Sequence, residues 1–348
     1  MKILIIGLGG IGQRHVRNLR ALFGDSIEIL AYRVRGRIHV VTPAMSADAS
    51  RNVEDEYSIR VFSSLDAALS EGPNAAFVCN PSNMHVPAAL AAVRSGCDVF
   101  IEKPVSHSMN GTPELLHEAA ARNAIVMVGY QLRFHPCIIK LAEILESGVL
   151  GNLLAGRATI GEYLPNWHPF EDYRQMYASR ADLGGGVVLS QIHELDYLYS
   201  YFGLPGRVYA VGGHWSELEI DVEDTASILM EFELAGRPLP IQLHQDYLQS
   251  PPNRQCEVIG DRGRAIMDLH ELSVSVFTRG DPSPVHYRFA GFERNQLFVN
   301  QLKHFMECLN TRKRPIVDLQ DGLQSLRMAL AVKQSMITHQ PVELATIG

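Results

Sequence analysis

The residues near the start of this sequence that are best suited to chemistry are the glycines of Gly7-Leu8-Gly9-Gly10-Ile11-Gly12, a G-x-G-x-x-G loop. The loop follows the apolar run 2–6, which is typical of a buried parallel strand. In such a loop the first glycine permits a tight turn, the second lets backbone approach a pyrophosphate, and the third allows close packing of helix on strand. The phosphate then lies at the helix N-terminus. The pattern predicts a dinucleotide site formed by Gly7, Gly9, Gly10, Ile11 and Gly12.

The next predicted strand, residues 27–32, leads into Arg33, Arg35 and Arg37. Dinucleotide sites that prefer NAD usually have an acidic residue here, which accepts hydrogen bonds from the ribose hydroxyls. An arginine instead binds phosphate through two parallel hydrogen bonds and stacks on adenine. The sequence therefore favours NADP(H), with Arg33 at the 2′-phosphate. NAD(H) is the alternative, and a solvated basic turn is the purely structural interpretation.

Composition limits the classes of protein. The chain has 348 residues, of which 46% are hydrophobic and 20% charged, enough for two globular domains. A net charge of -7 without a block of Lys or Arg argues against nucleic acid as a partner. We expect no membrane partner either, because the apolar start is broken by glycines and is interpreted as the first strand. Five scattered cysteines contain no C-x-x-C pair, so we expect a reducing, cytoplasmic location and no zinc.

The order of the predicted elements indicates an α/β fold with two domains. Up to residue 128, apolar strands around Val61 and at 74–79, 98–101 and 124–128 alternate with helices, which predicts a doubly wound parallel sheet. After Gly151 the long alternating runs 154–163, 207–215, 226–233 and 240–247, with a turn at 235–238, predict antiparallel strands. Two amphipathic helices follow, one with Phe298, Leu302, Phe305 and Leu309 and the other with Leu323, Leu326 and Leu330.

These observations predict a Rossmann domain at 1–128 and a substrate-binding and oligomerisation α+β domain at 129–348. The second domain is expected to contain an open, mostly antiparallel sheet. A large apolar sheet face left open would be a liability for a monomer. We therefore expect a homo-oligomer, either a dimer or a tetramer.

Polar motifs follow two of the predicted parallel strands, at the edge where ligands of such sheets bind. They are Asn80-Pro81-Ser82-Asn83-Met84-His85 and Glu102-Lys103-Pro104. Together with Gly184-Gly185-Gly186, followed by His193 and Asp196, they resemble the Gfo/Idh/MocA family of oxidoreductases along the whole chain. The resemblance implies NAD(P)-dependent oxidation or reduction of a secondary hydroxyl on a sugar, inositol or nucleotide sugar.

Lys103 and His193 are the predicted catalytic residues. When hydride leaves a carbinol carbon, the oxygen must lose a proton, and Lys103 can act as that acid or base. An ordinary strand-end lysine is the structural alternative. The resemblance implies that His193 contacts the reacting hydroxyl and that the bond before Pro104 is cis or strained. The residues predicted to contact the cofactor beyond the glycine loop and Arg33 are Asn80, Pro81, Asn83, His85, Glu102 and Lys103.

The sequence departs from the family pattern at Ser190, where related proteins often carry Asp. The site would lose a negative charge, so proton transfer would depend more on Lys103 and His193. Alternatively Asp196 takes part in proton transfer, because it lies three residues after His193 on the same helix face. The structural alternative is that Asp196 caps the helix or forms a salt bridge with it. Glu194 is expected to be solvated. No metal is predicted, because H-E-x-x-H would need a second histidine.

Candidate substrate contacts lie on either side of the domain junction. Gln131 and Arg133 follow the sixth predicted strand, while Trp167 and Arg174 precede the triple glycine. Amides can bind sugar hydroxyls, aromatic faces can stack on sugars, and an arginine can hold a carboxylate or phosphate. With Asp196 these form the predicted substrate set. An ordinary loop stabilised by Trp167 is the alternative. For the stretch 246–254 the sequence leaves three interpretations open: a second rim of the substrate site, a hairpin or an oligomer contact.

The sequence thus predicts an NADP(H)-preferring oxidoreductase that acts on a secondary hydroxyl or keto group of a sugar, sugar acid or nucleotide sugar. Two alternatives remain. One is an NAD-dependent cyclitol dehydrogenase that resembles inositol dehydrogenases. The other is a non-catalytic regulator of the same fold that binds a dinucleotide without turnover.

Overall fold

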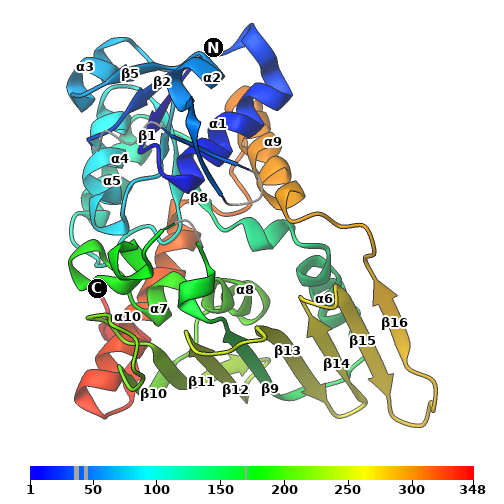
Figure 1. Ribbon diagram of the computed structural model, residues 1–348. Helices are drawn as coiled ribbons and strands as arrows, with labels where there is room; N and C mark the ends of the chain where they lie inside the picture. The colour runs from blue at the N-terminus through cyan, green and yellow to red at the C-terminus, as the bar shows by residue number, and fades with distance from the viewer. Residues whose placement is uncertain (35–38, 43–45, 169–170) are drawn as a thin grey trace.

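Two large β-sheets, one in each half of the chain, organise the computed structural model (Figure 1). The structure describes residues 1–34, 39–42, 46–168 and 171–348. In Figure 1 the N-terminal half lies above with helices around its sheet. The C-terminal sheet lies below, and its helices occupy the space between the two halves. The predicted fold class is confirmed.

The first sheet is parallel and has the order β5-β2-β1-β6-β7-β8. Its strands are β1 (Lys2–Ile6), β2 (Glu28–Tyr32), β5 (Arg60–Phe62), β6 (Ala75–Val78), β7 (Asp98–Glu102) and β8 (Val126–Gly129). The helices of this half are α1 (Gly10–Phe23), α2 (Val53–Tyr57), α3 (Leu65–Ser70), α4 (His85–Arg94) and α5 (Thr112–Ala121). A separate pair, β3 (His39–Val41) and β4 (Ala47–Asn52), was not predicted. Strand order reverses at β1, and ligands of doubly wound sheets bind at that switch point.

The apolar strands of the first sheet are buried on both faces, which explains their nearly continuous hydrophobic sequences. Ile3, Ile5 and Phe77 on one face belong to a cluster that also contains Leu302 and Phe305. Those two residues come from α9 (Asn295–Thr311), near the C-terminus of the chain. Although the sequence places α9 in the second domain, this helix therefore packs against the first sheet.

The second sheet has the order β16-β15-β14-β13-β9-β12-β11-β10-β17. Its strands are β9 (Leu153–Gly161), β10 (Arg207–Gly213), β11 (Thr225–Leu234), β12 (Arg237–Asp246), β13 (Asn253–Gly260), β14 (Gly263–Asp268), β15 (Ser273–Thr278), β16 (Val285–Arg288) and β17 (Val342–Glu343). The predicted hairpin is present, because Ala235 and Gly236 both adopt positive φ (51° and 74°) and connect β11 to β12. Such angles match a two-residue hairpin turn. Neighbouring strands are antiparallel except β9 and β12, which run parallel.

Helices cover one face of the second sheet (Figure 1). They are α6 (Pro136–Glu146), α7 (Val187–Ser190), α8 (His193–Phe202) and α10 (Leu319–Thr338). Short 3-10 turns complete the chain: η1 (Gly24–Ser26), η2 (Ser82–Met84), η3 (Gln131–Phe134), η4 (Leu164–Asn166), η5 (Tyr173–Gln175), η6 (Tyr177–Ser179), η7 (Ala181–Leu183) and η8 (Leu344–Thr346). α10 begins with a capping box between Asp318 and Asp321.

The opposite face of the second sheet is open and partly apolar. Tyr209, Val211 and Leu229 alternate with buried neighbours along β10 and β11 and are 39%, 42% and 47% exposed. They line a groove of about 540 Å³ together with polar side chains such as Arg157 and Gln242. The open sheet that the sequence predicts is therefore present.

Two further observations concern the cysteines and the length of the apolar helices. All five cysteines are buried and free. Among the described residues, no helix is both long and apolar enough to pass through a membrane.

Candidate active site

The glycine loop forms a cradle at the start of α1. Gly7 has φ of +103°, and a Cβ there would lie 2.8 Å from the Asn80 backbone nitrogen. A Cβ on Gly12 would lie 2.0 Å from the Gly7 carbonyl oxygen. Around Gly9 and Gly10, in contrast, a Cβ would meet nothing within 4 Å. The first backbone N–H groups of α1 have no side-chain cap and face this open space, so the loop fits the pyrophosphate of a dinucleotide.

Two glycine variants should separate folding from cofactor binding. We expect Gly12→Ala to lower the free energy of unfolding by about 1–3 kcal/mol, because the new methyl group meets backbone. Gly9→Ala, with a permitted φ of -70°, should retain that stability but bind dinucleotide more weakly. Denaturant unfolding and cofactor fluorescence titration measure the two effects. Equal cofactor affinity for Gly9→Ala and the unmodified protein would contradict the assignment.

His85 links the two strand-end loops that carry the predicted cofactor residues. Its Nδ1 and Nε2 atoms lie 2.7 Å from the carbonyl oxygens of Pro104 and Asn80 respectively. Burial lowers the pKa of His85, although both carbonyls favour its charged form. The imidazole is thus held by backbone. The side-chain oxygen of Asn80, in contrast, is buried without a hydrogen bond.

The loop after β6 also joins the two halves of the protein. Pro81 leads into η2, where the Ser82 hydroxyl donates to the carbonyls of Leu183 (3.0 Å) and Gly184 (3.2 Å). Asn83 donates to the Asp182 carbonyl at 2.8 Å. A Cβ on Gly184 would lie 2.5 Å from the Ser82 hydroxyl oxygen. The triple glycine therefore lets the two halves approach closely at this point.

Glu102 is held by a residue that sequence reasoning missed. Its Oε1 lies 2.7 Å from Nε2 of His15, and both side chains are buried. The other oxygen of Glu102 accepts a hydrogen bond from the Lys103 backbone N–H at 3.3 Å. The only signal for His15 in the sequence is its place three residues after Gly12. Glu102 thus connects the cofactor helix α1 to the backbone of Lys103.

Lys103 lies at the carboxyl end of β7, directly before a cis bond to Pro104. Its Nζ atom donates to the backbone carbonyl of Ser190 at 2.7 Å. The Ser190 hydroxyl is buried and makes no hydrogen bond of its own. At Ser190, where related proteins often carry Asp, the lysine is therefore contacted by a neutral backbone carbonyl.

His193 begins α8 and is only 5% exposed. Its Nε2 lies 3.1 Å from the side-chain amide of Gln131, and its ring meets the Tyr130 ring edge-on at 5.8 Å. Burial, followed by the charges of Lys103, Arg254 and Arg294, holds the pKa of His193 well below its usual range. These surroundings favour the neutral form of the imidazole, which is the form that accepts a proton.

Arg133 and Asp196, both predicted to contact substrate, are bound to each other. Nε of Arg133 lies 2.6 Å from Oδ2 of Asp196, and the second nitrogen lies 3.0 Å from Oδ1. Their side chains are 12% and 1% exposed. The Ser325 hydroxyl donates to Asp196 at 3.0 Å. The structure thus places these residues in an internal ion pair, and the carboxylate of Asp196 is directed at Arg133.

The other two predicted substrate residues occupy different environments. Trp167 packs edge-on against Tyr247 at 5.4 Å, and its indole N–H is buried without an acceptor. Arg174 is exposed and paired with Asp172 and Glu219. Of these two residues, Trp167 is the one with a polar group that lacks a hydrogen-bond partner.

Arg33, which the sequence analysis places at a 2′-phosphate, is also paired. Arg33 follows β2 and is paired with Glu54 of α2. Arg35 and Arg37, which the sequence analysis grouped with Arg33, lie outside the described residues.

The expectation that Glu194 is solvated is wrong. Its carboxylate is fully buried and receives two hydrogen bonds from Arg254 on β13, at 2.7 and 3.0 Å. The sequence could not reveal this pairing because the two residues are 60 positions apart.

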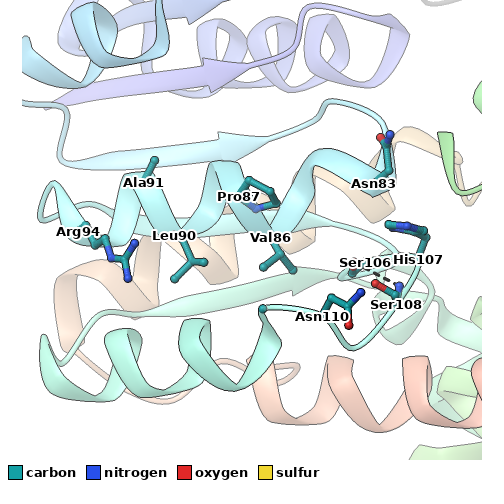
Figure 2. Close-up of a pocket in the computed structure, with 11 residues that line it drawn as sticks. Asn83, Val86, Pro87, Leu90, Ala91, Arg94, Ser106, His107, Ser108 and Asn110 are labelled. Carbon is teal, nitrogen blue, oxygen red and sulfur yellow. Dashed lines mark hydrogen bonds between the residues drawn. The ribbon is translucent and has the colours of Figure 1, made fainter. Parts of the chain in front are cut away.

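A separate pocket of about 540 Å³ lies beside this site, between α4 and the segment 106–111. Figure 2 shows Val86, Pro87 and Leu90 along the helix, with Asn83 and His107 at one end of the pocket. Lys103 and His193 are not among its lining residues. The pocket is therefore distinct from the group that could move a proton.

At the carboxyl edge of the first sheet, Lys103 contacts the Ser190 carbonyl, and Gln131 contacts His193, three residues after Ser190. The charge of Lys103 also lowers the pKa of His193. A lysine and a neutral histidine at one site can exchange a proton with a substrate hydroxyl. Within the described residues, no group of three or more His, Cys, Asp or Glu side chains is arranged to hold a metal ion.

Comparison with known proteins assigns both halves of the chain to one family of oxidoreductases. A model of an oxidoreductase family with an NAD-binding Rossmann fold matches residues 1–130, and a model of the C-terminal alpha/beta domain of that family matches residues 142–344. The myo-inositol 2-dehydrogenase of Thermotoga maritima is 26% identical, over 100% of this chain and 99% of its own length.

Solved structures share the fold. The myo-inositol 2-dehydrogenase of Lactobacillus plantarum has a TM-score of 0.78 at 21% identity, covering 99% of both chains. The WlbA dehydrogenase of Bordetella pertussis, solved with NADH and UDP-GlcNAcA, has a TM-score of 0.79 at 19% identity and covers 99% of this chain and 98% of its own. This chain belongs to the Gfo/Idh/MocA family of NAD(P)-dependent oxidoreductases.

Proposed function

We propose that this protein transfers hydride between a nicotinamide cofactor and a secondary hydroxyl or keto group of a sugar, sugar acid or nucleotide sugar. The observation that carries the proposal is the placement of Lys103 and the neutral His193 around the Ser190 turn, at the strand end next to the glycine cradle. The names of the similar dehydrogenases support a polyhydroxylated substrate.

The cofactor would be held at its pyrophosphate by Gly9, Gly10 and the N–H groups of α1, with Asn80 and the Lys103 strand end near the nicotinamide. When bound, the nicotinamide accepts hydride from the carbinol carbon or returns it to the carbonyl. The chain supplies the proton movement. In oxidation, Lys103 or His193 removes the hydroxyl proton, and in reduction it returns that proton to the oxygen.

Other residues of the site act by orientation. Gln131 holds the His193 imidazole, and the pair of His15 with Glu102 fixes the backbone of Lys103. His85 ties together the two loops that follow β6 and β7. Trp167, with its unpaired indole N–H, is the predicted substrate contact best placed to donate to a sugar hydroxyl.

A panel of sugars, uronates, cyclitols and nucleotide sugars, followed by nicotinamide absorbance with NADPH or NADP⁺ and with NADH or NAD⁺, tests the proposal. Turnover of at least one such compound is expected. Dinucleotide binding without turnover of any member would favour the regulator of the same fold.

We further propose a preference for NADP(H), supported by Arg33 at the end of β2. The ion pair with Glu54 holds the guanidinium at that strand end, where a 2′-phosphate could replace the carboxylate. The second candidate is an NAD-dependent cyclitol dehydrogenase. If the Glu54 carboxylate stays paired with Arg33, it occupies the place of a 2′-phosphate, and the ion pair then favours this candidate. The similar myo-inositol 2-dehydrogenases also favour it.

Arg33→Ala decides between these candidates. We expect it to weaken NADPH binding about tenfold or more, because a charge-assisted pair to the 2′-phosphate is lost, and to leave NADH binding unchanged. The affinities are measured by cofactor fluorescence. Arg60→Ala, an exposed arginine on the neighbouring strand β5, is the matched control. Unaltered NADPH affinity in Arg33→Ala would support the NAD-dependent candidate.

The open sheet supports a homo-oligomer, because the exposed apolar side chains of β10 and β11 suit a second copy of the chain. Light scattering of the purified protein tests this. Free, buried cysteines support a cytoplasmic location, which cell fractionation tests.

A further inference from the structure

The first turn of α8 carries His193 followed by two buried carboxylates, Glu194 and Asp196, and each carboxylate is paired with a different element. Asp196 pairs with Arg133 of η3, which follows the first sheet. Glu194 pairs with Arg254 of β13, in the second sheet. The pairing anchors the start of the helix to η3, which directly follows the last strand of the first sheet, and to the second sheet. Glu194 is the nearer anchor because it is adjacent to His193 in the chain.

The pair of Arg254 with Glu194 has good geometry for a buried ion pair. Both bonds, at 2.7 and 3.0 Å, join the planar guanidinium to the two carboxylate oxygens, which fixes the direction of the side chains as well as their distance. The side chains are 15% and 0% exposed. A buried ion pair seldom stabilises a protein more than apolar residues of the same size would. Its position, with Glu194 next to a candidate catalytic histidine, therefore favours a role other than stability.

We propose that Arg254, through its ion pair with Glu194, is a positioning residue that fixes the imidazole of His193 for proton transfer. The inference rests on the proposed function, in which His193 exchanges a proton with the substrate. Arg254 itself contacts neither of the reacting groups. It acts on the first turn of α8 and on the charge around the imidazole.

The electrostatic surroundings of His193 support this role. The cations that face it are Lys103 at the end of β7, Arg254 on β13 and Arg294 before α9; Gln131 and Tyr130 contact it as neutral groups. After burial, these three cations lower its pKa. The same guanidinium acts on His135, whose pKa burial and Arg254 together lower to about 4. Arg254 thus lies near two buried histidines and disfavours the charged form of both.

The sign of the pH effect follows. His193 must be neutral to accept the hydroxyl proton, so the rate of alcohol oxidation falls where His193 becomes protonated. Loss of the Arg254 charge raises the pKa of His193, because one of the cations that lowers it is gone. The acidic limb of kcat/KM should therefore move to higher pH.

The test compares Glu194→Gln/Arg254→Gln with the unmodified enzyme, using any substrate found active. The double change removes both charges and avoids leaving one buried ion without its partner. We expect kcat/KM to fall about 10- to 100-fold as the imidazole loses its orientation. The acidic limb should shift to higher pH while cofactor affinity is retained, because Arg254 is one of the cations that lower the pKa of His193, whereas Glu194 is not among the groups that shift it. Arg254→Lys, which keeps the charge but not the two-bond geometry, should lose rate without moving the limb.

Arg264→Gln is the matched control. Arg264 lies on β14, next to β13. Its side chain is 47% exposed and pairs with Glu257 of β13 instead of with a residue of α8. It should leave both kcat/KM and the pH profile unchanged.

The background of His193→Ala separates two kinds of failure. If Arg254 acts through His193, the double change should have no further effect on turnover in that background. An equal loss with and without His193, or an unshifted limb in the double variant, would overturn the inference. Full turnover by His193→Ala alone would instead remove His193 from the proposed mechanism.

Discussion

Lys103→Met should lower kcat by about 10²- to 10⁴-fold, which is the usual contribution of a positioned acid or base. Methionine has a similar length but no ionisable group, so it cannot take the hydroxyl proton. Cofactor affinity should stay unchanged, because the glycine cradle binds the dinucleotide through backbone N–H groups. Stopped-flow or steady-state turnover with the best substrate of the panel measures the first effect, and cofactor fluorescence the second.

The variant must be shown to remain folded, since Nζ of Lys103 also donates to the Ser190 carbonyl. Loss of that single hydrogen bond costs about 1 kcal/mol, which a melting curve can detect and which cannot account for the expected loss of rate. Lys303→Met, at an exposed position on α9, is the matched control. Turnover of Lys103→Met at the level of this control would remove Lys103 from the mechanism.

Most of the first sheet could be predicted from the sequence because its strands are buried on both faces. A strand such as β1 then reads as a nearly continuous apolar run, and the G-x-G-x-x-G loop marks where the first helix begins. The second sheet was harder. Strands β13 to β16 carry exposed polar residues and short turns, and their apolar positions alone do not distinguish strand from loop. The parallel pairing of β9 with β12 depends on contacts far apart in sequence.

The candidate site shows the same division. Lys103 and His193 could be chosen as candidates because each belongs to a local motif. The partners that hold them could not. His15 meets Glu102 across 87 positions, and Arg254 meets Glu194 across 60. A single sequence gives no sign of such pairings, so a buried carboxylate such as Glu194 looks like any solvated one.

The same limit explains why Arg133 was predicted to bind substrate. An arginine that follows a strand end, next to Gln131, has the right chemistry for a carboxylate. The carboxylate that it binds is internal, in Asp196, 63 positions later. Its internal role leads to the largest stability effect that we expect from a single substitution in this protein.

Arg133→Met should lower the free energy of unfolding by about 3–5 kcal/mol, because it leaves the buried Asp196 carboxylate without its counter-charge. Arg133→Met/Asp196→Leu should recover most of this loss, because it removes both charges and fills the space with apolar atoms. Chemical denaturation of the single and double variants, analysed as a double-mutant cycle, measures the coupling. Arg174→Met, at an exposed ion pair, is the control and should unfold like the unmodified protein.

The pH dependence of the Arg133→Met variant provides an independent check. Burial already raises the pKa of Asp196 above its usual value, although Arg133 opposes that rise. Without Arg133 the pKa must rise further. A carboxyl group whose pKa is higher in the folded state than in the unfolded state favours folding at low pH, and that contribution is lost as the pH rises through the folded-state pKa. The stability deficit of Arg133→Met should therefore shrink on acidification. A deficit that is constant with pH would show that lost packing, and not an unpaired Asp196 carboxylate, causes it.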